Sequence, residues 1–195
     1  MSSDRHPVAL LHAGQLILRP WRDTDRAPFA AMNADPRVME HFPATLSAEQ
    51  SDAFAERCIS AIDERGWGLW AAEIGGGAPF IGFIGLAIAG PDLPCSGAIE
   101  VGWRLAAAHW GKGYASEGAQ AALRYAFDEL EVPEIVSFTA IGNRRSQAVM
   151  ERLGMDRDPE GFEHPRVPEG NPVRPHVLYR LSRAAWRAMR DQRLA

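Results

Sequence analysis

A glycine-rich turn holds the residue types and spacing that most clearly indicate chemistry, Trp110-Gly-Lys-Gly-Tyr-Ala-Ser116. An alternating apolar run, residues 99–105, precedes it, and a run of helical periodicity, residues 112–130, follows, so a strand leads through the turn into a helix. Because the first turn of a helix leaves backbone N–H groups without intrahelical partners, and the macrodipole makes that end electropositive, such a turn attracts anions. Gly111 and Gly113 lack the Cβ atoms that would keep an anion away from those donors. The turn therefore predicts a site for a phosphate or a diphosphate.

Two other phosphate-binding motifs fit this turn poorly. A P-loop needs Ser or Thr directly after its lysine to hold a magnesium ion, but Lys112 is followed by Gly113. A dinucleotide-binding fingerprint needs a third glycine at the position of Ser116. It also lies in the first strand–helix–strand unit of its fold, whereas the strands before this turn are predicted to be antiparallel. The remaining alternative is a glycine-rich turn that binds no ligand.

Hydrophobic periodicity predicts the elements that position the turn. Strands are expected over residues 15–21, 67–74, 80–89, 99–105, 135–141 and 173–181, and helices over residues 47–65, 112–130, 143–154 and from 182 to about 193. Ser47 with Gln50 forms a capping box, whereas Asn143 and Gly154 are suited to begin and end the third of these helices. Antiparallel strands come first and a strand–helix–strand–helix–strand run follows, so the sequence predicts a mixed α/β fold.

Glycines mark two further features of the first strands. Three consecutive glycines, residues 75–77, predict a hairpin between the strands at 67–74 and 80–89. Gly82 and Gly85 lie inside the second of these strands, where glycine indicates a bulge or a close backbone approach.

Composition narrows the class of protein. The chain of 195 residues is 46% hydrophobic and 24% charged, which is typical of a globular protein, and we expect one domain over residues 1–195 with a core of about 15–182. The formal net charge of −4 gives no reason to expect a nucleic acid or an anionic membrane as partner. Cys58 and Cys95 lack metal or redox spacing, and no run is long enough for a signal peptide or a membrane span. A cytoplasmic protein is expected.

Residues 156–175 depart from the pattern elsewhere. They include five prolines and show no periodicity, so a long loop without regular structure is expected. Such loops are uncommon inside compact domains and are often functional. Prolines lower the entropy that is lost when a loop is held in one shape.

These motifs resemble those of the GNAT acyltransferase superfamily and, within it, the RimJ/RimL-like N-acetyltransferases. The superfamily signature Gln/Arg-x-x-Gly-x-Gly/Ala is similar to residues 110–115, with Trp110 in the first place. A second signature, an Asn that opens the next helix and a Leu-Gly-Phe that closes it, is matched by Asn143-x-x-Ser146 and by residues 153–155, where Met replaces Phe. The resemblance extends from about Gln15 to Ser182.

The resemblance implies an α/β fold with a mixed, mostly antiparallel sheet that is flanked by helices and splayed between its fourth and fifth strands, here residues 99–105 and 135–141. Acetyl-CoA would lie in that opening as cosubstrate, with its pantetheine arm paired to the backbone of Trp103, Arg104 and Leu105. Asn143 and Ser146 would face the pantetheine and the sulfur. The diphosphate would lie beside Trp110, on the N–H groups of Gly111, Lys112, Gly113, Tyr114, Ala115 and Ser116.

Acetyl transfer from a thioester to an amine needs a general base, and three residues are candidates. Glu100 lies on the strand that leads to the turn, on the face opposite Val101 by period-two counting, and a glutamate in the corresponding strand is the base in some members of the superfamily. The alternative for Glu100 is a surface residue or an ion pair with Arg104. Glu163 and His164 are the other candidates, since RimL-type enzymes place a proposed basic carboxylate in this region. A solvated loop carboxylate is the alternative for Glu163.

The departing thiolate needs a proton. Many superfamily members carry a tyrosine seven residues after the helix-opening Asn, but this chain has Met150, which cannot donate one. Ser146 shares a helical face with Val149, Met150 and Leu153, and a serine at this place is the suggested donor in RimL-like enzymes. The alternative is a hydroxyl that bonds back to a carbonyl one turn earlier.

We therefore expect an acetyl-CoA-dependent N-acetyltransferase that acts on a primary amine, either an N-terminal amine or a small molecule, without a metal. A catalytically idle acyl-CoA-binding module is the alternative from another class, and O-acylation or a longer acyl donor is a third. A homodimer is an expectation from the family, and Trp186 in the arginine-rich C-terminal helix suggests a contact for it.

Overall fold

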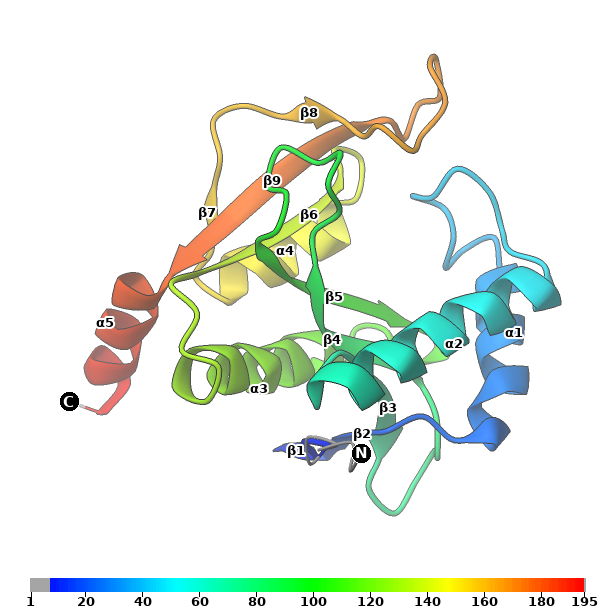
Figure 1. Cartoon of the computed structure of the whole chain (residues 1–195), viewed down its shortest axis with the longest axis horizontal. Coiled ribbons are helices and arrows are strands. Elements are labelled where there is room, and N and C mark those ends of the chain that lie inside the picture. Colours follow the sequence, from blue (N-terminus) through cyan, green and yellow to red (C-terminus); the bar gives the residue numbers. More distant parts are fainter. Residues whose placement is uncertain (1–7, 195) are drawn as a thin grey trace, which may run out of the picture. The chain divides into compact units, whose positions relative to one another are not determined.

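The structure is a computed structural model that describes residues 8–194, and its backbone packs into two compact units. The described parts of the first unit are residues 8–40, 44–86 and 102–122, and those of the second are residues 41–43, 87–101 and 123–194. Strands β4 (Gly82–Ile88) and β5 (Ile99–Leu105) and helix α3 (Tyr114–Asp128), all labelled in Figure 1, are divided between the two units. Whether residues 1–195 behave as one domain stays a prediction.

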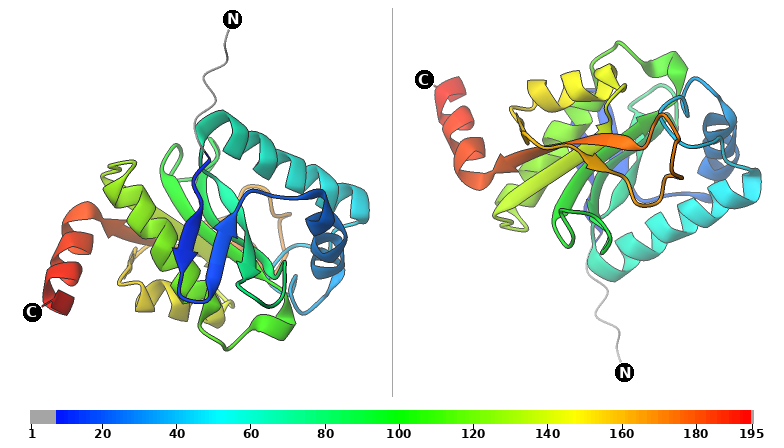
Figure 2. Two further views of the ribbon diagram at one scale, coloured as in Figure 1. Left: turned by 90° about the horizontal axis from the view of Figure 1, so that it is seen from below. Right: turned by 90° about the horizontal axis from the view of Figure 1, so that it is seen from above.

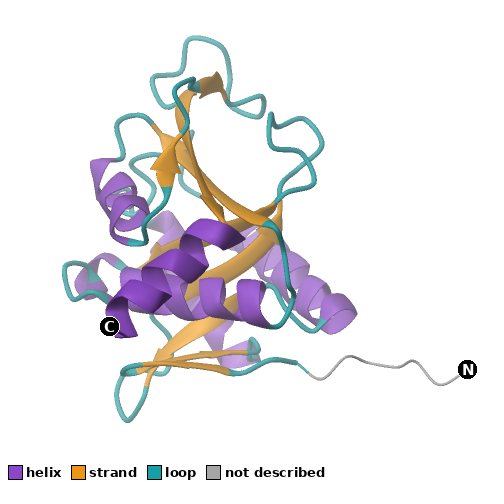
Figure 3. Cartoon of the chain, turned by 90° about the vertical axis from the view of Figure 1, so that its left-hand side faces the viewer, coloured by secondary structure: helices purple, strands orange, loops and turns teal. Residues whose placement is uncertain are grey.

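An antiparallel sheet in the order β1-β2-β3-β4, with β5 next to β4, forms the first unit. Strands β1 (Leu11–Ala13) and β2 (Leu16–Arg19) run side by side (Figures 2 and 3), and β2 pairs with β3 (Leu69–Ile74). The predicted hairpin between β3 and β4 is confirmed.

Gly82 shows why one of the strand glycines is required. A Cβ atom at this position would lie 2.1 Å from the carbonyl oxygen of Arg104, and its φ of +136° disfavours other residues. Gly85 approaches the carbonyl oxygen of Gly68 equally closely. The prediction of a close backbone approach at both glycines is confirmed.

The helices of the first unit begin where capping residues place them. The 3₁₀ turn η1 (Asp23–Asp25) leads into α1 (Arg26–Ala34), and α2 (Ala48–Arg65) begins after Ser47, whose hydroxyl accepts the Gln50 N–H at 3.2 Å. The Gln50 side chain accepts the Ser47 N–H at 2.9 Å in return, so the predicted capping box is confirmed. A second 3₁₀ turn, η2 (Ala107–His109), precedes α3.

Aromatic rings form the core between α1, α2 and the sheet of the first unit. Phe29 is fully buried, and its ring centroid lies 4.9–6.1 Å from the centroids of Trp21, Phe54, Phe80 and Phe83. Such edge-on and tilted contacts add to the free energy of burying apolar area.

A buried ion pair fixes the entry to α1. Arg19 on β2 donates to both carboxylate oxygens of Asp25 at 2.7 and 2.9 Å, and Arg19 and Asp25 are 3% and 1% exposed. The Arg19 Nε also donates to Glu73 on β3 at 2.6 Å. These bonds raise the pKa of Arg19, so the guanidinium stays charged inside the unit.

The second unit is built on β6 (Glu134–Ala140) and β9 (Pro175–Ser182), which pair antiparallel along their length. The parallel pairing of β5 with β6 covers only Ile99 opposite Ile135 and Glu100 opposite Val136, and beyond that point the Ser137 hydroxyl donates to the Val101 carbonyl at 2.9 Å. The backbone pairing of the fourth and fifth predicted strands, β5 and β6, therefore ends after two residue pairs. The sheet is mixed and mostly antiparallel and is flanked by helices, as predicted.

Two short strands correct the expectation of a loop without regular structure over residues 156–175. Both β7 (Asp156–Arg157) and β8 (Phe162–Glu163) pair with β9. Strands of two residues are too short to show a hydrophobic period, so the sequence could not predict them. The same reason explains why β1, three residues long, was not expected.

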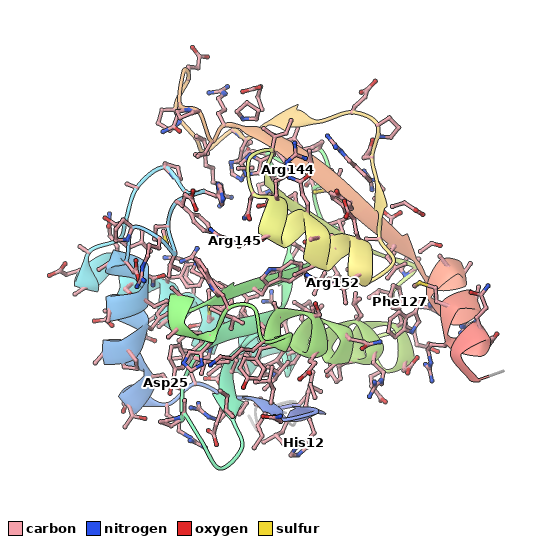
Figure 4. The ribbon with its side chains drawn as sticks, turned by 180° about the vertical axis from the view of Figure 1, so that it is seen from behind. His12, Asp25, Phe127, Arg144, Arg145 and Arg152 are labelled. Carbon is pink, nitrogen blue, oxygen red and sulfur yellow. The ribbon has the colours of Figure 1, made fainter. Side chains whose placement is uncertain are left out.

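Helix α5 (Arg183–Leu194) packs against the C-terminal end of α3 in the second unit. The Trp186 ring is 4% exposed and stacks on Phe127, which Figure 4 labels beside α5, at a centroid distance of 5.5 Å. This burial removes the basis for a dimer contact through Trp186. Arg183 donates to the Val132 carbonyl at 2.9 Å, and Arg190 pairs with Asp128 at 2.7 Å, so both arginines connect α5 to the rest of the second unit.

Among the described residues, no helix combines the length and the apolar character that crossing a bilayer requires.

Candidate active site

The glycine-rich turn lies in the first unit and joins β5 to α3. Gly111 and Gly113 have φ values of +72° and +85°, which favour glycine, and a Cβ atom at Gly111 would meet nothing within 4 Å. Trp110 closes the turn, because its indole N–H donates to the Leu105 carbonyl at 2.8 Å. The backbone of the turn is therefore held in place while the space beside Gly111 stays open.

A run of backbone N–H groups in this turn has no hydrogen-bond acceptor among the residues that the structure describes. Within residues 8–194, no N–H from Gly111 to Ser116 donates to another residue, and the first bond into the helix runs from the Glu117 N–H to the Gly113 carbonyl at 3.0 Å. Gly111, Lys112 and Gly113 are exposed, and the next three residues are half-buried. These consecutive donors lie at a helix N-terminus, where an anion is favoured, and the binding of an anion there stays a prediction.

The side chain of Arg104 on β5 is engaged inside the first unit. Its guanidinium donates to the side-chain amide oxygen (Oδ1) of Asn33 at 2.7 Å and lies 5.4 Å from the ring centroids of both Phe54 and Phe83. Burial lowers the pKa of Arg104 to about 10. The role predicted for Trp103, Arg104 and Leu105 uses the backbone, so the side-chain contacts of Arg104 do not conflict with it.

Glu100 is half-buried on β5 in the second unit, opposite Val136 of β6. In the part of the chain that the structure describes, its carboxyl forms no hydrogen bond or ion pair, so the alternative of a pair with Arg104 is not supported. Burial raises the pKa of Glu100 to about 8, because no neighbouring donor or cation offsets the loss of water. A carboxyl that titrates near pH 8 is suited to accept a proton from an amine.

Asn143 opens helix α4 (Arg144–Arg152), with Arg144 and Arg152 at its two ends (Figure 4). The Asn143 side-chain oxygen accepts the Ser146 N–H at 3.1 Å, and its amide nitrogen donates to the Thr139 hydroxyl at 2.9 Å. Capping thus accounts for the Asn143 side chain, and its predicted contact with pantetheine stays a prediction.

The Ser146 hydroxyl has no hydrogen-bond partner among residues 8–194, so the bond back to a carbonyl one turn earlier is absent from the described part of the chain. Ser146 is half-buried, while Val149, Met150 and Leu153 on the same helical face are buried, as the spacing predicts. A half-buried hydroxyl without a partner remains able to donate to a ligand.

Glu163 and His164 lie at β8, beside β9. Glu163 is exposed and pairs with Arg174 at 3.0 Å, which agrees with the alternative of a solvated loop carboxylate. His164 is half-buried, and burial, followed by the neighbouring His176, lowers its pKa to about 4. Its imidazole is therefore neutral at pH 7.

The second unit thus brings Asn143 together with Ser146 and Glu163 together with His164, but no described hydrogen bond or ion pair links Glu100 to Ser146 or to β8. His176 on β9, whose ring centroid is 4.7 Å from that of His164, was missed from the sequence. Its only signal was a histidine inside an apolar alternating strand.

No group of three or more His, Cys, Asp or Glu side chains in the described chain is arranged to hold a metal ion. The expectation that no metal takes part in the reaction stays a prediction.

Comparison with known proteins assigns the family. Residues 15–156 match the sequence profile described as "Acetyltransferase (GNAT) domain". The chain belongs to the GNAT acetyltransferase family. It is 30% identical, over 188 residues that cover 92% of this chain and 78% of the relative, to the FsC-acetyl coenzyme A-N(2)-transacetylase of Aspergillus fumigatus. With this match, the assignment as an N-acetyltransferase that uses acetyl-CoA is confirmed.

Solved structures agree with the family. The crystal structure of a GNAT-family acetyltransferase from Bacillus anthracis superposes with a TM-score of 0.75 at 25% identity and covers 90% of this chain and 99% of its own. The fold of Mycobacterium smegmatis RimJ, solved in complex with CoA-disulfide, is also similar, with a TM-score of 0.67 at 18% identity and 96% of each chain covered.

Proposed function

We propose that this GNAT N-acetyltransferase is of the RimJ/RimL-like kind and acetylates a primary amine by direct attack on acetyl-CoA in a ternary complex. The observation that carries this proposal is the run of unused backbone N–H groups from Gly111 to Ser116 at the N-terminus of α3. The similarity to RimJ, which was solved with a CoA derivative, and to a transacetylase that uses acetyl coenzyme A supports it.

The turn would recognise the diphosphate of CoA. Its two glycines keep side chains away from the N–H groups, and the electropositive helix end favours the two negative charges. Hydrogen bonds to a charged acceptor contribute about 1.5–3 kcal/mol each. In the proposal the pantetheine arm pairs with the backbone of Trp103, Arg104 and Leu105, and it reaches Asn143 and Ser146.

The acceptor must lose a proton before its nitrogen can attack. At pH 7 a lysine-type amine with a pKa of about 10.4 costs roughly 4.6 kcal/mol to deprotonate, whereas an α-amino group with a pKa of about 8 costs only about 1.4 kcal/mol. An α-amine therefore needs less from the base. On this difference in the cost of deprotonation we propose an α-amine as the preferred acceptor.

We assign the proton transfers to Glu100 and Ser146. The Glu100 carboxylate accepts the amine proton, directly or through water, as the nitrogen bonds to the acetyl carbon. The C–S bond then breaks, and the Ser146 hydroxyl donates its proton to the CoA thiolate. Glu100 is supported by its lack of an ion pair and by its raised pKa, and Ser146 by its unpartnered hydroxyl. Glu163 and His164 remain secondary candidates for the base.

Thiol release tests the function. The protein is incubated with acetyl-CoA and, separately, with a peptide bearing a free N-terminus, a peptide with a blocked N-terminus and a free lysine, and a small primary amine. Release of CoA thiol with the α-amine is the expected result. Tight CoA binding without thiol release for any acceptor would instead indicate an idle acyl-CoA-binding module, which the buried Met150 in place of a tyrosine would explain.

Replacing Ser146 by Ala tests its role as acid. Loss of general acid catalysis lowers kcat by about 10²-fold or more, while the Kd for CoA should change less than twofold. Ser96→Ala, at an exposed serine of the second unit, is the matched control. Full turnover in Ser146→Ala would remove Ser146 from the mechanism.

We also propose a cytoplasmic location. Cys58 and Cys95 are buried free thiols, and burial raises the pKa of Cys58 to about 12. Unreactive thiols suit a reducing compartment.

A further inference from the structure

Four aromatic side chains of the second unit gather where β6, β8 and β9 meet, and two of them are histidines. His164 and His176 have ring centroids 4.7 Å apart. Phe138 lies 6.0 and 6.3 Å from these two rings, and Phe162 lies 6.1 and 5.5 Å from them. His176 is 9% exposed and His164 is half-buried, so two titratable rings share one apolar cluster.

Hydrogen bonds indicate whether Nδ1 carries a proton in each of the two rings. The backbone N–H of Arg166 donates to Nδ1 of His164 at 3.2 Å, and a nitrogen that accepts a hydrogen bond cannot carry a proton. The Nδ1 of His176 lies 2.9 Å from the Arg174 carbonyl, which can only accept, so this nitrogen carries its proton. The His164 contact therefore exists only while that ring is neutral.

The backbone carbonyl of Arg174 also holds residues 161–167 against β9. The Arg174 carbonyl also accepts the backbone N–H of His164 at 2.9 Å, and the Val167 N–H donates to the His164 carbonyl at 3.0 Å. Gly161 allows the close approach, because a Cβ atom there would lie 2.7 Å from the His176 carbonyl oxygen. The position of residues 161–167 on β9 thus depends on backbone bonds made at His164, next to a second histidine.

We propose that the His164–His176 pair is an acid-sensitive contact that holds residues 158–174 on β9 and releases them when His164 is protonated. A proton on Nδ1 would remove the bond from the Arg166 N–H and place a cation against the His176 ring. This proposal does not require acetyl transfer, although Glu163 and His164 itself are the secondary candidates for the general base, so its test is read by hydrogen exchange and not by activity.

The charged groups around the pair come from each element packed against it. Arg166, in the turn after β8, opposes protonation of His164, as does His176. Glu163 on β8 favours the charged form of His176, but its carboxylate is paired with Arg174 at 3.0 Å. From β6 the pair meets the uncharged ring of Phe138.

The adjoining segment 89–98 contributes Cys95, a buried thiol whose pKa burial raises, to the apolar cluster beneath Phe138 and Phe162. Burial also lowers the pKa of His176, although the Arg174 carbonyl and Glu163 partly oppose this shift. The surroundings therefore favour neutral rings in the closed segment. Once the segment opens, His164 regains the ordinary histidine pKa of about 6.5, and acid drives the opening.

Hydrogen exchange of the full chain, read by mass spectrometry, measures the opening. The pKa of His164 is about 4 in the closed segment and about 6.5 in the open one. Lowering the pH from 7.5 to 5.0 therefore raises the equilibrium constant for opening by at most about 30-fold. Because His164 is partly exposed, we expect an increase of about fivefold or more. Rates are corrected for the intrinsic pH dependence of exchange. The increase should be confined to peptides from residues 158–176.

His164→Asn is the decisive variant, since the Asn side-chain oxygen can accept the Arg166 N–H but does not titrate in this range. Its exchange over residues 158–176 should change less than twofold between the two pH values. His12→Asn, at an exposed histidine on β1 that Figure 4 labels, is the control and should behave like the unmodified protein. Persistent acid-induced opening in His164→Asn would assign the effect to another group and overturn the proposal. Equal exchange of the unmodified protein at both pH values, or equal acid-induced loosening of α4, would also overturn it.

A measurement on the unmodified protein guards against misfolding of the variant. In an NMR titration, the Arg166 amide resonance should shift with the same midpoint as the His164 ring resonances. Independent midpoints would refute the coupling.

Discussion

Replacing Gly111 by Ala separates the cost of a left-handed backbone from the cost of lost anion binding. The φ of Gly111 is +72°, and an added Cβ atom would meet nothing within 4 Å. In the protein without ligand, the substitution therefore lowers the free energy of unfolding only through the unfavourable backbone conformation. That conformation costs a residue with a Cβ atom about 1–2 kcal/mol. For a chain of this length, each kcal/mol lowers Tm by about 2–4 °C, so we expect a loss of about 2–8 °C.

Gly76 provides a matched control in the same unit. Its φ is +70° and its Cβ position is also open, but it lies in the β3–β4 hairpin turn, outside the glycine-rich turn of residues 110–116. Gly76→Ala should lose the same stability as Gly111→Ala. Only Gly111→Ala should also lose affinity for CoA.

The loss of affinity follows from the hydrogen bonds at the turn. If the Cβ atom keeps the diphosphate from one N–H, the missing charge-assisted bond costs about 1.5–3 kcal/mol. This free energy raises the Kd for CoA by about 10- to 150-fold. Isothermal titration calorimetry measures the Kd, and differential scanning calorimetry measures the Tm. A Kd for Gly111→Ala within twofold of that for Gly76→Ala would refute the assignment of the diphosphate to this turn.

Three further predictions concern catalysis and stability. Burial raises the pKa of Glu100 to about 8, so its carboxylate fraction rises with pH. The acetyl transfer rate of the unmodified protein, divided by that of Glu100→Gln, should therefore increase with pH, reach half its maximum near pH 8 and level off above about pH 9. A ratio that stays constant from pH 6 to 9 would contradict the role of Glu100 as base. Asp25→Ala leaves the charge of Arg19 buried without its partner and should lower the free energy of unfolding, measured in urea, by about 3–5 kcal/mol. The control Asp35→Ala removes an exposed ion pair and should change this free energy by less than about 1 kcal/mol. Equal losses of free energy in the two variants would be inconsistent with the buried pair. Trp186→Ala removes a buried stacked ring and should lower the free energy of unfolding by about 3–5 kcal/mol. The elution volume in size-exclusion chromatography should not change. A change in oligomeric state without this loss of stability would indicate that Trp186 makes a dimer contact after all.

Local signals in the sequence were sufficient for most elements of the fold. The capping box at Ser47 and Gln50, the hairpin glycines at 75–77 and the glycine-rich turn each act through neighbours a few residues away, and each has the predicted structure. The limited pairing of β5 with β6 was expected from the family resemblance, not from the residues alone.

Contacts between distant residues could not be predicted in the same way. The Arg104 side chain donates to Asn33, which is 71 positions earlier, although strand periodicity made Glu100 its nearest candidate partner. The pairing of β8 with β9 brings His164 to His176 and Glu163 to Arg174, but neither strand pairing nor ion pairing across a proline-rich segment has a local pattern. The sequence therefore predicted the conformation of the glycine-rich turn more completely than the surroundings of the residues that would act in catalysis.

The central claim is that backbone N–H groups from Gly111 to Ser116 hold the diphosphate of acetyl-CoA. A crystal structure of the protein with bound acetyl-CoA tests it most directly. We predict diphosphate oxygens at hydrogen-bond distances, about 2.7–3.2 Å, from several of these nitrogens. A bound cofactor whose diphosphate lies elsewhere, with the turn occupied only by water, would contradict the claim.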